Sequence, residues 1–109
     1  FVRAVFFQLT APQQPTARES AVQACHLLNN FDIPTGTELP WGKASVELPS
    51  ATQFTVASDT HNHMLYYRTM YNSNIRCIDL ATIDFDQVKY HSEPLDKEKK
   101  QPIEMITIR

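Results

Sequence analysis

The sequence predicts an α+β fold in which two antiparallel helices pack on an antiparallel β-meander. Apolar residues recur at helical spacing within residues 1–31, and three strand-like segments separated by polar turns occupy residues 52–80. A polar tail, residues 91–109, follows. With 109 residues, 42% of them hydrophobic and 20% charged, the chain has the composition of one globular domain or part of one.

The first helix is expected over residues 1–9, where the apolar residues share one helical face: Val2, Val5, Phe6 and Leu9. The aromatic and β-branched content of this segment would also suit a strand. Residues 11–15 contain two prolines and are expected to form the loop that ends the helix.

The second helix is expected from Thr16 to about Asn30. Thr16 and Glu19 have the spacing of a capping box, in which each side chain satisfies a free group of the first turn. The apolar face of this helix comprises Ala21, Ala24, Cys25 and Leu28. Pro34 disfavours a helical conformation at Ile33, so the chain should leave the helix in extended form.

The meander is expected to consist of three strands: residues 53–58, 64–71 and 75–80. Polar residues 59–62 would turn the chain between the first two strands, and Asn72-Ser73-Asn74 between the second and third. Alternation in the last strand places Ile75 and Cys77 on one face.

The remaining segments are less regular. Residues 35–51 suggest a long loop with one short strand at 45–48, and a further short strand is expected at 88–90. Residues 93–100 are a charge run, typical of a solvated loop. Residues 103–108 are expected to close the chain as a terminal strand.

Charge and composition exclude several functions. The formal net charge is −2 and no basic stripe is present, so a nucleic-acid partner is not expected. No apolar run reaches the roughly 18 residues of a membrane span. The sequence contains neither a glycine-rich phosphate loop nor a visible signal peptide, and Phe1 suggests a start created by a cut. We expect no cofactor.

Cys25 and Cys77 could form one disulfide, lie as two buried thiols, or be unrelated. Two buried thiols are the favoured interpretation, because free cysteine is among the most buried residue types. Cys25 precedes His26, but neighbouring helical residues diverge by about 100° and do not form a catalytic dyad.

The other candidate sites have simpler structural interpretations. Asp59, His61 and His63 could bind a metal weakly, but no further ligand follows at a suitable spacing, so a polar turn and no metal site are predicted. Paired carboxylates at Asp84 and Asp86 are interpreted as a solvated turn. Three tyrosines could line a ligand pocket, but we expect them to pack within the sheet instead. They are Tyr66, Tyr67 and Tyr71.

The order of the segments resembles the choloylglycine hydrolase family, which includes bile salt hydrolases and penicillin V acylases. The resemblance is carried by FVRAVFF at residues 1–7, by ESAVQACHLLNNFDIPTG at residues 19–36, and by residues 52–80. It spans about residues 1–90, and its NNFDIP form is similar to the Gram-negative branch. The resemblance implies that residues 1–109 are the C-terminal portion of one four-layer αββα domain, that of an N-terminal-nucleophile hydrolase.

In that family the nucleophile is a cysteine at residue one, whose own amine acts as the base. Residue one here is Phe1, so the resemblance implies that this chain contains no catalytic residue and that the nucleophile lies outside it. Phe1-Val2-Arg3 matches the last three letters of the family's Arg-aromatic-aliphatic-Arg motif, which makes Arg3 the second, structural arginine. No substrate-binding residue is assigned.

The resemblance also implies partners: the remaining N-terminal part of the hydrolase, a small-molecule amide substrate, and further copies in a homo-oligomer. It implies a periplasmic or secreted location, with a cytoplasmic one as the alternative. The competing hypothesis is a self-contained α+β module for binding or subunit association. Bile salt or penicillin V preference is not predicted.

Overall fold

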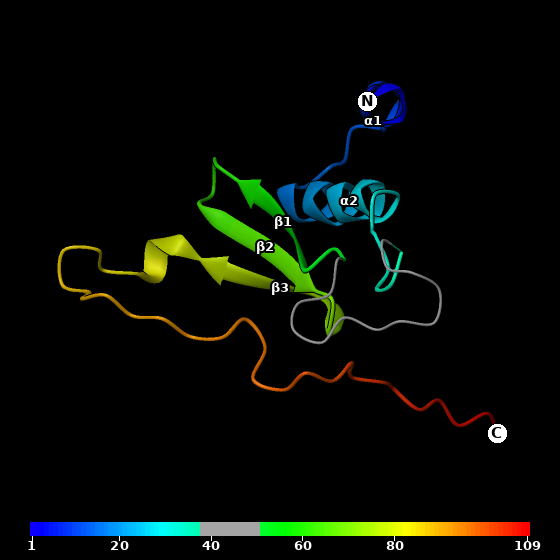
Figure 1. The fold of residues 1–109 in the computed structure, drawn as a ribbon. Coiled ribbons are helices and arrows are strands. Elements are labelled where there is room, and N and C mark those ends of the chain that lie inside the picture. The colour runs from blue at the N-terminus through cyan, green and yellow to red at the C-terminus, as the bar shows by residue number, and fades with distance from the viewer. Residues whose placement is uncertain (38–50) are drawn as a thin grey trace.

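The computed structural model describes residues 1–37 and 51–109 and confirms the predicted α+β class. Two helices precede three strands and a single turn of 3₁₀ helix at Leu80–Thr82 (Figure 1). The helices and strands have the following bounds: α1 Val2–Thr10, α2 Ala17–Asn29, β1 Phe54–Asp59, β2 Met64–Thr69 and β3 Asn72–Asp79. The short strand predicted at 45–48 lies outside the described residues.

The three strands form the predicted antiparallel meander, in the order β1-β2-β3. One row of paired residues, Ala57, Tyr66 and Cys77, faces α2. The neighbouring row, Val56, Tyr67 and Arg76, lies on the opposite face, because successive strand residues point to opposite sides. We call this second side the open face of the sheet.

The turn between β2 and β3 lies at residues 70–71, so the prediction of a turn at 72–74 is wrong. The Asn72 backbone N–H donates to the Thr69 hydroxyl at 3.2 Å, and the Asn74 N–H donates to the Asn72 side-chain oxygen at 2.9 Å. Asparagine often forms turns because its side chain bonds the nearby backbone. In this structure the same kind of bond stabilises the first residues of β3 instead.

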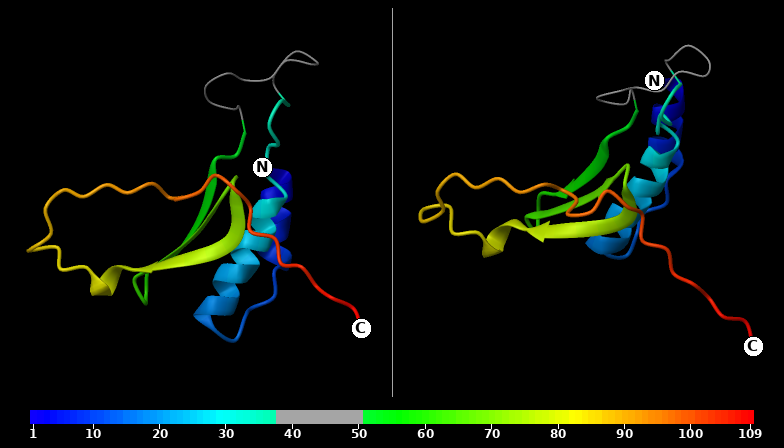
Figure 2. Two further views of the ribbon diagram at one scale, coloured as in Figure 1. Left: turned by 90° about the horizontal axis from the view of Figure 1, so that it is seen from below. Right: turned by 60° about the horizontal axis from the view of Figure 1, so that its bottom comes forward.

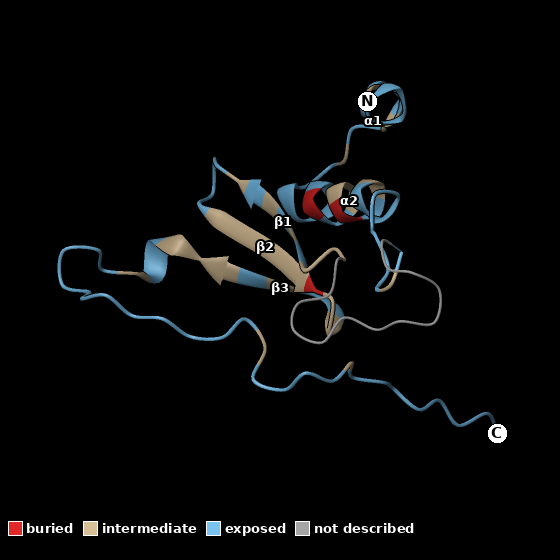
Figure 3. Ribbon diagram, in the orientation of Figure 1, coloured by how far each residue is buried: buried red, intermediate tan, exposed pale blue. Residues whose placement is uncertain are grey.

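Helix α2 begins with Thr16 as its N-cap, as predicted, but the Glu19 carboxylate bonds the Thr16 hydroxyl instead of the backbone N–H that a complete capping box requires. The Glu19 backbone N–H donates to the Thr16 hydroxyl at 3.2 Å, and that hydroxyl donates to the Glu19 carboxylate at 2.7 Å. The helix packs its apolar face on β1, and two of its residues, Ala21 and Cys25, are buried. In Figure 3 the buried parts of α2 are drawn in red.

Helix α1 lies on the side of α2 that faces away from the sheet (Figures 1 and 2). The prediction that both helices lie against the meander is therefore right only for α2. The Arg3 guanidinium donates to the Asn30 carbonyl at 3.1 Å and lies 5.1 Å from the centre of the Phe31 ring. Phe7 meets the same ring edge-on, with 6.4 Å between centroids. These contacts attach α1 to the end of α2.

Little of the described chain is buried. Ala21, Cys25 and Thr69 are the only residues classed as buried among those described, and no large side chain there is fully covered. On the open face, Phe54 is 58% exposed and Val56 is 38% exposed. Strands of this composition normally cover such a face with another layer.

The tail runs beneath the sheet in extended form and then away from it (Figure 1). Residues 88–90 and 103–108, both predicted as strands, form no strand. An isolated extended segment leaves its backbone hydrogen bonds to water, and neither segment pairs with a described strand. Neither described helix combines the length and hydropathy that crossing a membrane requires.

Candidate functional site

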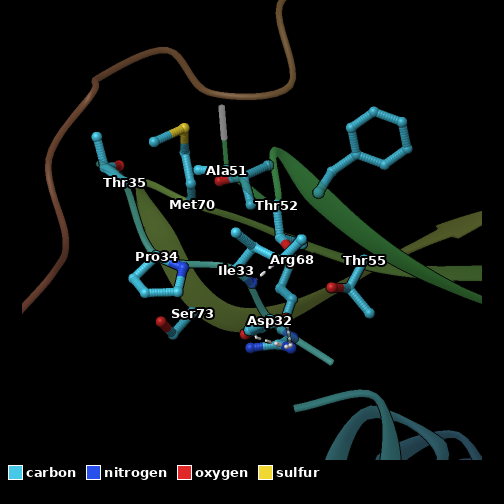
Figure 4. Close-up of a pocket in the computed structure, with 12 residues that line it drawn as sticks. Asp32, Ile33, Pro34, Thr35, Ala51, Thr52, Thr55, Arg68, Met70 and Ser73 are labelled. Carbon is cyan, nitrogen blue, oxygen red and sulfur yellow. Dashed lines mark hydrogen bonds and ion pairs between the residues drawn. The ribbon is translucent and has the colours of Figure 1, made fainter. Parts of the chain in front are cut away.

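A cleft opens where the chain leaves α2 and passes the end of the sheet, with a volume of about 290 Å³ (Figure 4). The polar part of its lining consists of one ion pair and several hydroxyl groups. The residues that supply them are Asp32, Arg68, Thr35, Thr52, Thr55, Thr69 and Ser73. The lining includes apolar side chains but neither cysteine nor histidine.

Two backbone segments fix the position of this cleft. The Ile33 N–H donates to the Thr52 hydroxyl at 2.9 Å, and the Thr52 N–H donates to the Ile33 carbonyl at 3.0 Å. The extended exit from α2, predicted from Pro34, is thereby joined to the segment that leads into β1. This arrangement holds Asp32 beside the sheet.

The ion pair crosses the cleft from β2 to the α2 exit. Arg68 Nη2 donates to the two carboxylate oxygens of Asp32 at 3.2 and 3.1 Å. The Arg68 side chain is 13% exposed, whereas that of Asp32 is 41% exposed. Arg68 Nε is buried and has no hydrogen-bond partner in the described structure. The cleft can therefore hold a small polar group, but its lining among residues 1–37 and 51–109 offers no activated nucleophile.

The polar turn predicted at Asp59 is confirmed. Its carboxylate accepts the backbone N–H groups of His61 and Asn62, both at 3.1 Å, and the Asn62 side-chain amide at 2.7 Å. Hydrogen bonding by the Asn62 side chain, then by its backbone, lowers the pKa of Asp59 below its ordinary value. No three metal-ligating side chains gather within residues 1–37 and 51–109.

The buried-thiol prediction is right for Cys25 and wrong for Cys77. Cys25 is 3% exposed, and burial raises the pKa of its thiol, with the Arg68 charge acting weakly in the other direction. Cys77 is exposed on β3, an edge strand of the sheet, and its sulfur lies 3.9 Å from that of Met64. Both cysteines are free. His26 is exposed, and although it lines the same cleft as Cys25, no hydrogen bond joins the two side chains in the described structure, so they form no dyad.

The tyrosines do not share a pocket. Tyr66 faces α2, where burial raises the pKa of its phenol. Tyr67 lies on the open face, and the centre of its ring is 4.6 Å from the guanidinium carbon of Arg76. Tyr71, in the turn, lies 5.6 Å from the Lys99 ammonium. The prediction that all three tyrosines pack within the sheet is therefore right for Tyr66 and Tyr67 and wrong for Tyr71, which lies in the turn against a charged side chain.

The remaining candidates are structural. Asp84 accepts the N–H groups of Asp86 and Gln87 at 3.1 and 3.3 Å, which confirms a solvated turn. The contacts of Arg3 are those with Asn30 and Phe31 described above.

Sequence reasoning missed two arginine clusters, one at Arg68 and one at Arg76. Arg76 Nη1 donates to Asp96 Oδ1 at 2.8 Å, across 20 positions of sequence. The alternation of β2 could have placed Arg68 on the α2 side of the sheet. Nothing in the charge run distinguishes Asp96 from its acidic neighbours.

Comparison with known proteins gives the family. The model of the linear amide C–N hydrolases, choloylglycine hydrolase family, matches residues 1–93. Among solved structures, a mutant conjugated bile acid hydrolase from Clostridium perfringens is similar, with a TM-score of 0.62 and 21% identity. The match covers 98% of this chain and 29% of that chain. No curated protein matches. The chain belongs to the choloylglycine hydrolase family of linear amide C–N hydrolases.

Proposed function

We propose that this chain is the C-terminal part of an amide hydrolase that cleaves conjugated bile salts or penicillin V through an N-terminal cysteine located outside residues 1–109. The family match over residues 1–93 is the observation that carries the proposal. The similar solved structure is that of a conjugated bile acid hydrolase, and the share of that protein covered, 29%, is what a part of such a hydrolase would give.

The exposure of the open face is evidence that a further layer packs on it. Helices α1 and α2 stack on one side of the sheet, whereas Phe54 and Val56 on the other side remain exposed. In the four-layer arrangement that we propose, a second sheet from the remaining part of the hydrolase covers this face. Burial of apolar area contributes about 25 cal/mol per Å², so this interface would add substantially to stability.

The state of the cysteines agrees with an external nucleophile. A reactive cysteine needs access and a lowered pKa, but Cys25 is buried and its pKa is raised. Cys77 is exposed, yet no histidine is among the residues that line the cleft beside it. The chemistry would therefore take place on residues beyond this chain, and the present residues would support the sheet that positions them.

The test uses the full-length protein, by which we mean the natural chain that contains residues 1–109. We expect it to release glycine or taurine from conjugated bile salts, or phenoxyacetate from penicillin V. Replacing its first mature cysteine by serine or alanine should reduce the rate by a factor of at least about 100. Folded protein that is inactive on all these amides would contradict the proposal.

A second candidate, subunit association, is favoured by the outer face of α1. Val2 and Leu9 are each 80% exposed there. This role is compatible with the hydrolase and would produce a homo-oligomer. We expect Leu9→Lys to lower the oligomeric state in sedimentation, with Gln8→Lys as the matched control, and an unchanged state would oppose the role.

A further inference from the structure

The open face carries an arginine site beside the turn between β2 and β3. Arg76 on β3 pairs in register with Tyr67 on β2, and its guanidinium carbon lies 4.6 Å from the centre of the Tyr67 ring. Arg76 Nη2 also donates to the Thr69 hydroxyl at 3.1 Å. Thr69 is 7% exposed, so this hydroxyl is a fixed part of the sheet. The ring and the hydroxyl together hold the orientation of the guanidinium.

The tail supplies the oxygen atoms that this guanidinium binds. Arg76 Nη1 donates to Asp96 Oδ1 and to the Leu95 carbonyl, both at 2.8 Å. The side chains of Asp96 and Arg76 are 10% and 26% exposed. Such charge-assisted hydrogen bonds are short, and they are stronger than neutral ones.

A second attachment lies five residues further along the tail. The Ser73 backbone N–H, at the start of β3, donates to the Gln101 side-chain oxygen at 2.7 Å. Between the two attachments, the Lys99 ammonium lies 5.6 Å from the centre of the Tyr71 ring. Lys97 and Glu98 point into solvent. The tail is therefore held at both ends of a short segment.

Asp96 differs from the neighbouring acidic residues in its surroundings. Glu93 pairs with His91 at 3.0 Å, but both side chains are about two-thirds exposed, at 66% and 70%. Hydrogen bonding to the Thr69 hydroxyl, then to Arg76, lowers the pKa of Asp96. Asp96 also follows the end of the family match at residue 93. The attachment thus joins a strand of the family fold to a segment beyond the match.

We propose that Arg76, Tyr67 and Thr69 form a carboxylate-binding site that the chain fills with its own Asp96, and that residues 94–101 dock on the sheet as one strap. Docking covers the edge of the open face beside the turn, and release exposes the guanidinium to other carboxylates. Every contact that holds the strap lies within residues 67–101, so the strap proposal does not rest on the amide hydrolysis proposed above.

The Ser73 amide gives a direct readout, because its N–H donates to the Gln101 side-chain oxygen at the far end of the strap, at 2.7 Å. If the strap releases as one unit, D96N in the full-length protein should speed hydrogen exchange at Ser73 although Asp96 does not touch that amide. We expect about tenfold faster exchange, since a charge-assisted bond is lost. Glu98→Gln, the matched control, removes the same charge from the same segment at an exposed side chain and should leave the rate unchanged.

Two further measurements make the result decisive. Gln101→Leu should speed exchange at Ser73 at least as much as D96N, because it removes the acceptor itself. The paired amides of β1 and β2 should keep their protection in every variant, which separates strap release from global unfolding. If Gln101→Leu speeds exchange at Ser73 and D96N does not, the two attachments act separately and the proposal is overturned. Equal effects of D96N and Glu98→Gln would also overturn it.

Discussion

Arg68 on β2 joins Asp32, 36 positions earlier in the chain, through one guanidinium nitrogen that donates to both carboxylate oxygens. The pair ties the exit of α2 to the centre of the sheet, across the cleft of Figure 4. The arginine is largely covered, at 13% exposure, and the aspartate is not, at 41%. The two ends of the pair should therefore respond differently to substitution.

Asp32→Asn should destabilise the full-length protein more than Arg68→Met does. The first leaves a mostly buried guanidinium without its carboxylate, which should cost about 1–3 kcal/mol, whereas the second leaves a carboxylate that water can reach. Urea unfolding midpoints measure both. Asp86→Asn, with the same change of charge in a solvated turn, should have almost no effect. If both variants lose the same free energy of unfolding, the two side chains of the pair do not differ in burial as described.

Thr16→Ala should destabilise the protein by about 1 kcal/mol, the usual cost of losing a helix N-cap. Its hydroxyl accepts the Glu19 N–H and donates to the Glu19 carboxylate, and both bonds are lost in the variant. Thr60→Ala, an exposed threonine in a turn, is the control. A thermal unfolding midpoint that matches that of Thr60→Ala would contradict the capping role.

Cys25 should react with iodoacetamide more slowly than Cys77 in the native protein. The first thiol is buried and its pKa is raised, so it is both covered and less often a thiolate, whereas the second is exposed. Peptide mass mapping after brief labelling at pH 8 gives both rates. The difference should disappear in concentrated urea, and equal native rates would exclude the burial described for Cys25.

The turn at Asp59 should weaken at low pH. The pKa of its carboxyl is lowered in the folded state by hydrogen bonds from Asn62, first from the side chain and then from the backbone. The stabilisation is thus complete above the unfolded value, about 3.9, and is lost as pH falls through the lower folded value. Asp59→Ala should therefore reduce stability at pH 7 but much less at about pH 2. A cost that is independent of pH would contradict this assignment.

The sequence allowed the elements to be predicted, but not all their partners. The N-cap at Thr16 and the polar turn at residues 59–62 are local signals, and both gave the correct structure. The helical period of α1 identifies an apolar face without saying what covers it, so its position beyond α2 was not foreseen. The turn was misplaced because asparagine side chains bond the backbone equally well at a strand start.

The arginine sites were missed for a different reason. Each depends on a partner far away in sequence, Asp32 for one and Asp96 for the other. In the printed sequence Asp96 resembles the other members of a charge run, and only the position of the tail beneath the sheet distinguishes it. Nothing local encodes that position.

We propose that residues 1–109 are part of a larger hydrolase and need its other layer. Among the described residues, only Ala21, Cys25 and Thr69 are buried, which is too small a core to offset the loss of chain entropy. The most direct measurement is the thermal unfolding of isolated residues 1–109, followed by calorimetry. We predict aggregation or a broad, weak transition. A sharp, reversible transition of a monomer would contradict the claim and favour the self-contained module.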